Sequence, residues 1–460
     1  MGKQTRYMNR RDFLKSSSLT AAALAATPGL TYSQVLGGAA PFDDYRALVC
    51  VFLFGGNDSF NMLVPRSDAE YNVYATSRQN LAIQQDQLLP INPLTSDGVD
   101  YGLHFSMAGL QSLFESGNAA FVTNVGPLVV PTTKDEFFNK SVPLPPQLFS
   151  HNDQQNQWLS LRGRAQTKTG WAGRMADLIR ANVSGQQMAT NASLFGSNTF
   201  QSADETVPYI MGPRGPEQFG FMSSNPNDGL LYEQRLAFSR IIDAEYDSIY
   251  ERGFSAVQRR AIDAADRVSG AITNARNSGA VTTVFPPGQL STQLETVAYL
   301  IAAREELQMQ RQIFFVATGG FDSHDDQVEN QPGLLGNISA SIAAFYAATE
   351  ELGLADSVTT FTQSDFGRTL TSNGDGTDHA WGGNQLVVGG SVLGRELYGS
   401  YPLLQIGGAD DVGGGRMIPT TSADQFAATL AKWFGIPDAD LDIVAPHIDN
   451  FVTRDLGFMV

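Results

Sequence analysis

Continuous apolar runs of strand length are the clearest pattern along the chain. Residues 47–54 are apolar throughout, and the run ends at Gly55-Gly56, as expected of a strand that is buried on both faces of a sheet. Similar runs follow later in the chain, and they span residues 119–125, 313–318, 358–363 and 385–388. The pattern therefore predicts five strands of one buried sheet.

Helical periodicity separates these runs. Met107, Leu110 and Phe114 lie on one helical face before the second predicted strand. Ser422 and Gln425 have the spacing of a capping box, which predicts that a helix begins there. Because strands that alternate with helices form parallel sheets covered on both faces, we expect an α/β fold of three α/β/α layers with a mostly parallel central sheet.

Residues 185–288 interrupt this alternation. The first part of the segment is rich in Gly, Asn and Pro, and the second part, residues 230–275, has the pattern of a long charged helical stretch. A chain of this length has room for two or three average domains, but the regular alternation elsewhere favours one. We therefore predict a single α/β domain over residues 41–460, with residues 185–288 as a partly helical cap or insertion.

The N-terminus has the pattern of an export signal. The letters NRRDFLK at residues 9–15 precede a small, mildly apolar run at residues 19–30, which predicts a twin-arginine signal peptide and leader over residues 1–40. An amphipathic surface helix is the alternative interpretation. No later stretch approaches the ~18 apolar residues needed to span a bilayer, so we expect no transmembrane segment in the mature chain. The predicted location is the periplasm or the outside of the cell.

The remaining chain is strongly acidic. Without the five basic residues and one acidic residue of positions 1–40, the formal net charge changes from −17 to −21, because 25 basic side chains then face 46 acidic ones. Such a chain repels phosphate backbones, which excludes nucleic acid as an expected partner. An anionic substrate would need local positive charge, from a metal ion or from a few arginines. The sequence says nothing about protein partners.

Acidic and histidine residues follow the predicted strands. Asp58 and Asp322 each come four residues after a predicted strand, and Asp365 comes two residues after another. His324 lies beside Asp322, and His379 lies in the loop after Asp365. Because the carboxyl ends of parallel strands meet at one edge of a sheet, we expect these side chains to converge. Each residue alone is equally explained as an ordinary turn or helix-cap residue.

The mixture of ligand atoms indicates which cations such a site would hold. Carboxylates together with imidazoles are the usual ligands of hydrolytic zinc, manganese and iron sites. Calcium and magnesium prefer more oxygen ligands. We therefore expect one or two divalent ions, with zinc favoured and manganese, iron, calcium or magnesium as alternatives.

Several motifs together resemble a known family. They are the letters FGGND at residues 54–58, Ser150-His151 with Gln155, Gly170-Trp171 with Arg174, TGGFDSH at 318–324 with Gln327, SDFGRT at 364–369 and GTDH at 376–379. This set resembles a bacterial secreted family known as domain of unknown function 1501, over nearly the whole mature chain. The family is similar to a remote branch of the alkaline phosphatase and sulfatase superfamily, which implies an alkaline phosphatase-like fold.

The resemblance also implies a two-position metal site. Asp322, His324 and His379 would match one position, and Asp58 and Asp365 would match the other. In the superfamily, three residues usually separate the pair that corresponds to Asp322 and His324, but here only one does.

A second departure concerns the other position. Where the superfamily has an Asp-His pair, this chain has Asp365-Phe366, so one imidazole is missing. Three outcomes follow: His151 replaces the missing ligand, the position holds a harder ion, or it is empty.

Ser150 is the candidate nucleophile. It opens a predicted helix, where backbone N–H groups favour an oxyanion or a phosphoryl group, but together with Asp153 it is equally an ordinary helix start. Ser59 is the second candidate. Arg368 and Arg174 are candidates to bind anionic oxygens in a bidentate manner, and structural salt bridges are the alternative for both.

The function expected from these residues is an exported metal-dependent hydrolase of phosphate or sulfate esters, acting on an anionic small molecule or glycan ester. The alternative is a non-catalytic secreted metal-binding or assembly protein on the same fold, which the substitution at Phe366 motivates. A metal-free serine esterase is disfavoured. It would need an Asp three residues before His447, and Val444 stands there.

Overall fold

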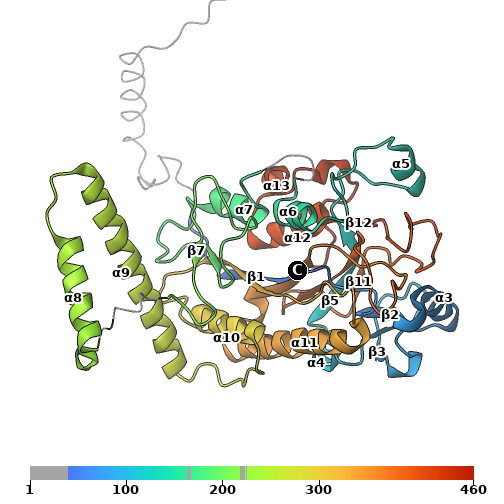
Figure 1. Cartoon of the computed structure of the whole chain (residues 1–460), viewed down its shortest axis with the longest axis horizontal. Coiled ribbons are helices and arrows are strands. Elements are labelled where there is room, and N and C mark those ends of the chain that lie inside the picture. Colours follow the sequence, from blue (N-terminus) through green and yellow to red (C-terminus); the bar gives the residue numbers. More distant parts are fainter. Residues whose placement is uncertain (1–39, 163–166, 218–222, 224) are drawn as a thin grey trace, which may run out of the picture.

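The computed structural model describes residues 40–460, except for 163–166, 218–222 and 224 (Figure 1). The predicted twin-arginine motif and its apolar run, in residues 1–39, therefore lie outside the described residues. Within the described part, no helix is long and apolar enough to cross a membrane.

A nine-stranded sheet forms the centre of the molecule. Its order is β11 (Leu397–Tyr398), β5 (Ala119–Gly126), β10 (Gly383–Val388), β9 (Val358–Ser364), β1 (Arg46–Leu53), β8 (Arg311–Thr318), β6 (Asn191–Ser193) and β7 (Tyr209–Ile210), and β12 (Thr421–Ser422) pairs with β5. All five predicted strands are present. The described neighbours pair in parallel except at β10, which is antiparallel to β9 and β5, so the prediction of a mostly parallel sheet is confirmed.

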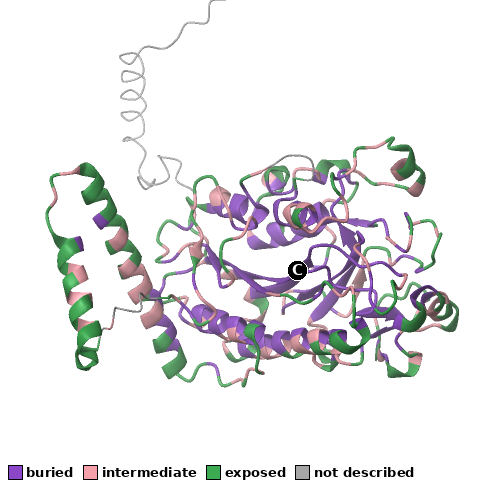
Figure 2. Ribbon diagram, in the orientation of Figure 1, coloured by how far each residue is buried: buried purple, intermediate pink, exposed green. Residues whose placement is uncertain are grey.

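Both faces of this sheet are buried beneath helices (Figures 1 and 2). Along β1, Val49 and Val51 belong to one core and Cys50 and Phe52 to the other, because successive side chains of a strand point to opposite faces. The first core is covered by α4 (Ala108–Glu115), α10 (Gln289–Ala302) and α11 (Gln327–Glu351). The second is covered by α6 (His151–Ser160), α7 (Trp171–Ile179), α12 (Ala423–Phe434) and α13 (Leu441–Val444). The predicted α/β/α layering is confirmed.

The capping box predicted for α12 is also present. Ser422 precedes the helix, its hydroxyl accepts a hydrogen bond from the N–H of Asp424 at 3.1 Å, and its own N–H donates to Gln425 Oε1 at 3.0 Å. The helix ends at Gly435, whose φ of 113° favours glycine.

The direction of β10 has a topological cause. No helix separates β9 from β10, and a parallel neighbour would require a crossover connection. The chain therefore returns antiparallel, and β10 begins at the edge where β9 ends. As a result the whole loop of residues 365–382 stays at the carboxyl edge of the parallel strands.

The segment predicted as an insertion has two parts. Its first part supplies β6 and β7 at one edge of the central sheet. Its second part forms α8 (Leu230–Asp243) and α9 (Ile249–Asn277), a helical hairpin that projects from one end of the molecule (Figure 1). Val268 and Ile272, near the end of α9, join the core beside α10, which attaches the hairpin to the body.

Smaller elements complete the fold. An antiparallel sheet of β2 (Leu63–Pro65), β4 (Tyr101–Leu103) and β3 (Leu89–Ile91) lies next to α3 (Asp68–Arg78) in Figure 1, and α5 (Lys134–Asn139) lies near β12 in the same view.

Candidate metal centre

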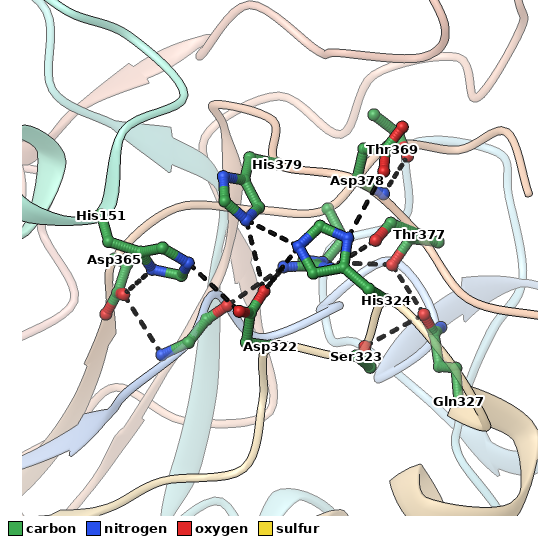
Figure 3. A network of polar contacts seen from close by, with 12 residues as sticks. His151, Asp322, Ser323, His324, Gln327, Asp365, Thr369, Thr377, Asp378 and His379 are labelled. Carbon is green, nitrogen blue, oxygen red and sulfur yellow. Dashed lines mark hydrogen bonds and ion pairs between the residues drawn. The ribbon is translucent and has the colours of Figure 1, made fainter. Parts of the chain in front are cut away.

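Four side chains from three segments meet at the carboxyl edge of the parallel strands (Figure 3). His151 is the first residue of α6, Asp322 and His324 follow β8, and His379 lies in the loop between β9 and β10. Among the described residues, the ligand atoms of His151, Asp322 and His379 all lie within 4.8 Å of one another. His324 adjoins this group, with its Nε2 2.9 Å from Nε2 of His379.

Two glycines allow the supporting loops to approach so closely. Gly55 has a φ of 115°, and a Cβ there would lie 2.3 Å from the backbone nitrogen of Asp322. A Cβ at Gly376 would lie 2.3 Å from the backbone of His324. Only glycine fits at these two contacts.

Asp322 is the centre of the cluster. Its Oδ1 accepts a hydrogen bond from Arg368 Nη1 at 2.7 Å and lies 3.0 Å from His324 Nε2 and 3.3 Å from His379 Nε2. Its Oδ2 lies 3.4 Å from His151 Nε2. Burial raises the pKa of Asp322, but Arg368 and the neighbouring imidazoles outweigh it, so this pKa is below its usual value. Asp322 is therefore a carboxylate at neutral pH.

Each of the three cluster histidines has an oxygen atom close to its Nδ1, on the side of the ring away from Asp322 Oδ. His151 Nδ1 lies 2.6 Å from Asp365 Oδ2, and His379 Nδ1 lies 2.9 Å from the backbone carbonyl of Phe149. His324 Nδ1 lies 3.4 Å from Asp378 Oδ1. Because carbonyl and carboxylate oxygens only accept, the proton of a neutral ring is placed on Nδ1 and the Nε2 lone pair is left toward Asp322. Imidazoles that ligate metals are usually oriented in this way.

The protonation of His379 is consistent with that arrangement. Burial lowers the pKa of His379, the nearby His151 and Arg368 act in the same direction, and the Phe149 carbonyl only partly offsets them. The ring therefore stays neutral, which is the form that binds metal.

The donor set fits one divalent cation. The Nε2 atoms of His324 and His379 lie 2.9 Å apart, and they lie 3.0 and 3.3 Å from Oδ1 of Asp322. Two imidazole nitrogens and a carboxylate oxygen this close together would be suitable ligands for one cation. Imidazole nitrogens together with one carboxylate match zinc, iron or manganese better than calcium or magnesium.

Asp365 lies behind His151 in the structure. Its side chain is fully buried, and its Oδ2 accepts from His151, from Gln155 Nε2 at 2.8 Å and from the N–H of Gly55 at 3.2 Å. Burial raises the pKa of Asp365, and the hydrogen bonds from Gln155 and His151 offset part of this effect. Phe366 packs against His151 and His379, with ring centroids 4.8 and 4.6 Å apart. Phe366 therefore forms an apolar wall beside the two imidazoles.

Asp58 is not brought to the cluster. It is buried, and its Oδ2 is held by Arg78 of α3 and by the amide of Gln327. Within the described part of the chain, no hydrogen bond or ion pair joins Asp58 to the four cluster residues.

The two arginines considered for substrate binding make structural contacts. Arg368 is fully buried, and its three nitrogens donate to Asp322, to the carbonyls of Gly55 and Thr377 and to the Thr377 hydroxyl. Arg174 donates to backbone carbonyls at the ends of α6 and α13 and in the loop before α7: those of Ser160, Thr169, Ile443 and Val444.

The two serine candidates are hydrogen-bonded within the protein. Ser150 immediately precedes α6, and its hydroxyl donates to Asp153 Oδ2 at 2.7 Å. Ser59 is buried, and its hydroxyl accepts from the N–H of Asn384 at 2.6 Å.

Several residues that support the site were not assigned a role from the sequence. Gln155 and Gln327 stand in the family motifs, but their amides carry no signal of which atoms they bind. Arg78 lies 20 residues after Asp58, at the last position of α3, and no local pattern predicts that pairing.

The comparisons with known proteins identify the family. The chain belongs to the family described as "Protein of unknown function (DUF1501)", which matches residues 45–442. No curated protein matches the sequence.

Two solved structures are similar over most of the chain. One is described as the crystal structure of Ps i-CgsB in complex with k-i-k-neocarrahexaose; it is 10% identical, covers 90% of this chain and 78% of its own, and has a TM-score of 0.33. The other is described as "Metabolism of multiple glycosaminoglycans by bacteroides thetaiotaomicron is orchestrated by a versatile core genetic locus". It is 10% identical, covers 86% of this chain and 74% of its own, and has a TM-score of 0.30.

Proposed function

We propose that this member of the family is an exported metal-dependent hydrolase of phosphate or sulfate esters, acting on an anionic small molecule or glycan ester. The observation that carries the proposal is the convergence of imidazole Nε2 atoms on the Asp322 carboxylate, with an oxygen acceptor behind each ring. The twin-arginine pattern supports export, and the resemblance of the motifs to the alkaline phosphatase and sulfatase superfamily supports the reaction class.

One divalent ion is the cofactor that the donor set favours, with zinc first. His379 and His324 would hold it through Nε2, and Asp322 would supply the anionic ligand. Such an ion supplies a Lewis acid that neutralises charge on the ester oxygens. Arg368 keeps Asp322 ionised and in place, because its buried guanidinium is fixed by Gly55 and Thr377.

His151 is suited to two roles. Its Nδ1–H donates to Asp365, which fixes the orientation of the ring with Nε2 toward Asp322. Nε2 then either completes the ligand set or moves a proton to and from the reacting oxygen. Metal content separates the two roles. His151→Ala protein that keeps its metal but loses turnover identifies an acid–base residue, and protein that loses the metal identifies a ligand.

Ser150 is the side-chain candidate for the nucleophile, because it precedes His151 at the N-terminus of α6. Its hydroxyl must leave Asp153 before it can attack an ester. A water molecule at the cluster is the alternative nucleophile.

The direct test starts with protein purified from the periplasm without added metal. We expect about one equivalent of zinc, manganese or iron by elemental analysis, and hydrolysis of aryl phosphate or aryl sulfate that disappears in Asp322→Ala. Wild-type protein without stoichiometric metal, or turnover unchanged by Asp322→Ala, contradicts the proposal.

A non-catalytic metal-binding or assembly protein is the second candidate. The observation that favours it is Arg368, whose three nitrogens are already occupied by protein acceptors and whose side chain is buried. Tight metal binding without turnover of any ester in a broad panel would support this candidate. Turnover that Ser150→Ala abolishes would exclude it.

A further inference from the structure

A chain of hydrogen bonds connects the buried Asp58 to the exposed edge of the cluster. Its central member is Gln327, the first residue of α11, whose side chain is buried. Gln327 Nε2 donates to the Asp58 carboxylate. Gln327 Oε1 accepts from the hydroxyl of Thr377 at 2.6 Å and from that of Ser323 at 3.1 Å (Figure 3).

The chain continues from Thr377 to the centre of the cluster. The Thr377 hydroxyl accepts from Arg368 Nε at 3.1 Å, and Arg368 Nη1 donates to Asp322 Oδ1 at 2.7 Å. Four hydrogen bonds therefore join Asp58 to Asp322 through three intervening side chains.

The direction of each hydrogen bond is determined by chemistry. The carboxylate of Asp58 only accepts, so the NH₂ group of Gln327 must face it and the amide oxygen must face the hydroxyls. The single proton of Thr377 is used on Gln327, which leaves an oxygen lone pair for Arg368. A reversed amide would place two acceptors together at Asp58.

The two hydroxyls lie on the two loops that carry the cluster. Ser323 stands between Asp322 and His324, and Thr377 stands two residues before His379. The backbone N–H of Thr377 also donates to the carbonyl of Ser323 at 2.9 Å. One amide side chain thus holds together loops that follow two different strands.

We infer that Gln327 is a positioning residue that sets the separation of these loops and so the geometry of the metal ligands. Asp58 is the anchor of Gln327 and not a ligand. The inference rests on the proposed metal site, because its effect is measured as cation affinity. Residues that orient metal ligands typically change affinity by about 10–100-fold when they are replaced.

The test compares Gln327→Met with a matched control, Gln331→Met. Gln331 lies one turn further along α11, is also buried, and donates to the backbone carbonyl of Asp58 at 3.0 Å. It also accepts from Asn61 at 3.2 Å, and among the described contacts none joins it to the two loops. Both substitutions remove a buried amide from the same helix.

Zinc affinity is measured by competition with a chromogenic chelator, and the Tm of the metal-free protein is measured in parallel. We expect zinc binding about 10–100-fold weaker in Gln327→Met and unchanged in Gln331→Met, with similar losses of Tm. Thr377→Val should weaken zinc binding like Gln327→Met, and Thr377→Ser should retain it. The threonine pair decides the matter if Gln327→Met does not fold.

Two results overturn the inference alone. The first is wild-type zinc affinity in both Gln327→Met and Thr377→Val. The second is a loss of zinc affinity in Gln331→Met as large as that in Gln327→Met, because the loss would then reflect lower stability and not the position of the loops. Wild-type protein that binds no zinc, manganese or iron overturns the proposed metal site and this inference together.

Discussion

The loops after β1 and β8 have similar sequences, but their aspartates have different surroundings. The two strands pair in parallel with Leu53 opposite Thr318, and each is followed by a Gly-Gly pair and then an aspartate. Asp58 is buried against the guanidinium of Arg78, whereas the side chain of Asp322 is 45% exposed and lies among three imidazoles. Similar sequence positions therefore carry one structural and one candidate ligand carboxylate.

The partners of each carboxylate account for the difference. The charge of Asp58 is matched within a buried ion pair, so no cation is needed there. Arg368 donates to Oδ1 of Asp322, whereas Oδ2 has, among the described residues, His151 as its one polar neighbour, at 3.4 Å. A carboxylate at a strand end marks the edge where ligands of parallel sheets usually bind. The side chains that contact the carboxylate decide its role.

Breaking the buried pair should have the largest effect. Arg78→Met leaves the Asp58 carboxylate uncompensated in the interior, and we expect the free energy of unfolding to fall by about 3–5 kcal/mol. Urea denaturation of the metal-free protein measures it. Zinc affinity of the folded fraction should change much less. Intact stability with lost zinc binding would reverse the roles assigned to the two loops.

Acid should destabilise the same buried region through His104. Burial lowers the pKa of His104 to about 4, while the nearby Asp58 charge acts in the opposite direction. The unfolded chain binds a proton below pH ~6.5 and the folded chain only below about 4, so stability is lost as the pH falls through that window. The full difference is about 3 kcal/mol.

The measurement is the difference between wild-type and His104→Gln unfolding curves from pH 7 to pH 4. The difference cancels the contributions of other groups, including Asp424, whose pKa burial raises to about 7. If the difference in the free energy of unfolding between wild-type and His104→Gln protein is constant across this pH range, His104 is not a buried neutral histidine.

Asp322→Asn should separate metal binding from stability. It keeps the shape of the side chain but removes the charge, and we expect zinc affinity to fall about 100-fold, or roughly 2.7 kcal/mol. The amide oxygen can still accept from Arg368, but the buried guanidinium loses its counter-charge, so we expect the free energy of unfolding of the metal-free protein to fall by about 1–3 kcal/mol, less than in Arg78→Met. Calorimetric titration and urea denaturation give the two values. A large stability loss with normal affinity would place Asp322 in the same class as Asp58.

Ser150→Ala should have the smallest effect if the serine only begins α6. We expect a loss of about 1 kcal/mol in the free energy of unfolding, from the hydrogen bond to Asp153, with unchanged zinc affinity and unchanged ester turnover. Asp153→Ala is the matched control, since it removes the other partner of the same hydrogen bond. Turnover lost in Ser150→Ala and kept in Asp153→Ala would instead identify Ser150 as the nucleophile.

The layers of the fold were predictable because their signals are local. Buried parallel strands are apolar on both faces, so residues 47–54 could be recognised without any knowledge of their neighbours. The capping box of Ser422 and Gln425 likewise involves residues three apart. The direction of β10 depends instead on the absence of a helix before it, which a search for apolar runs does not consider.

The candidate site was predictable only in part, for a related reason. The convergence of Asp322, His324 and His379 follows from the rule that parallel strands end at one edge. The pairing of Asp58 with Arg78 depends on how α3 packs, and the position of Asp365 behind His151 depends on how α6 enters the edge. Long-range packing of this kind leaves no spacing in the sequence.

The most direct measurement is the metal content of wild-type and His379→Ala protein, purified without added metal. The cluster predicts about one divalent ion per chain in the wild type and a large loss in His379→Ala, because Nε2 of that ring is fixed toward Asp322 by the Phe149 carbonyl. Wild-type protein without stoichiometric metal, or His379→Ala protein with the same content, would contradict the account.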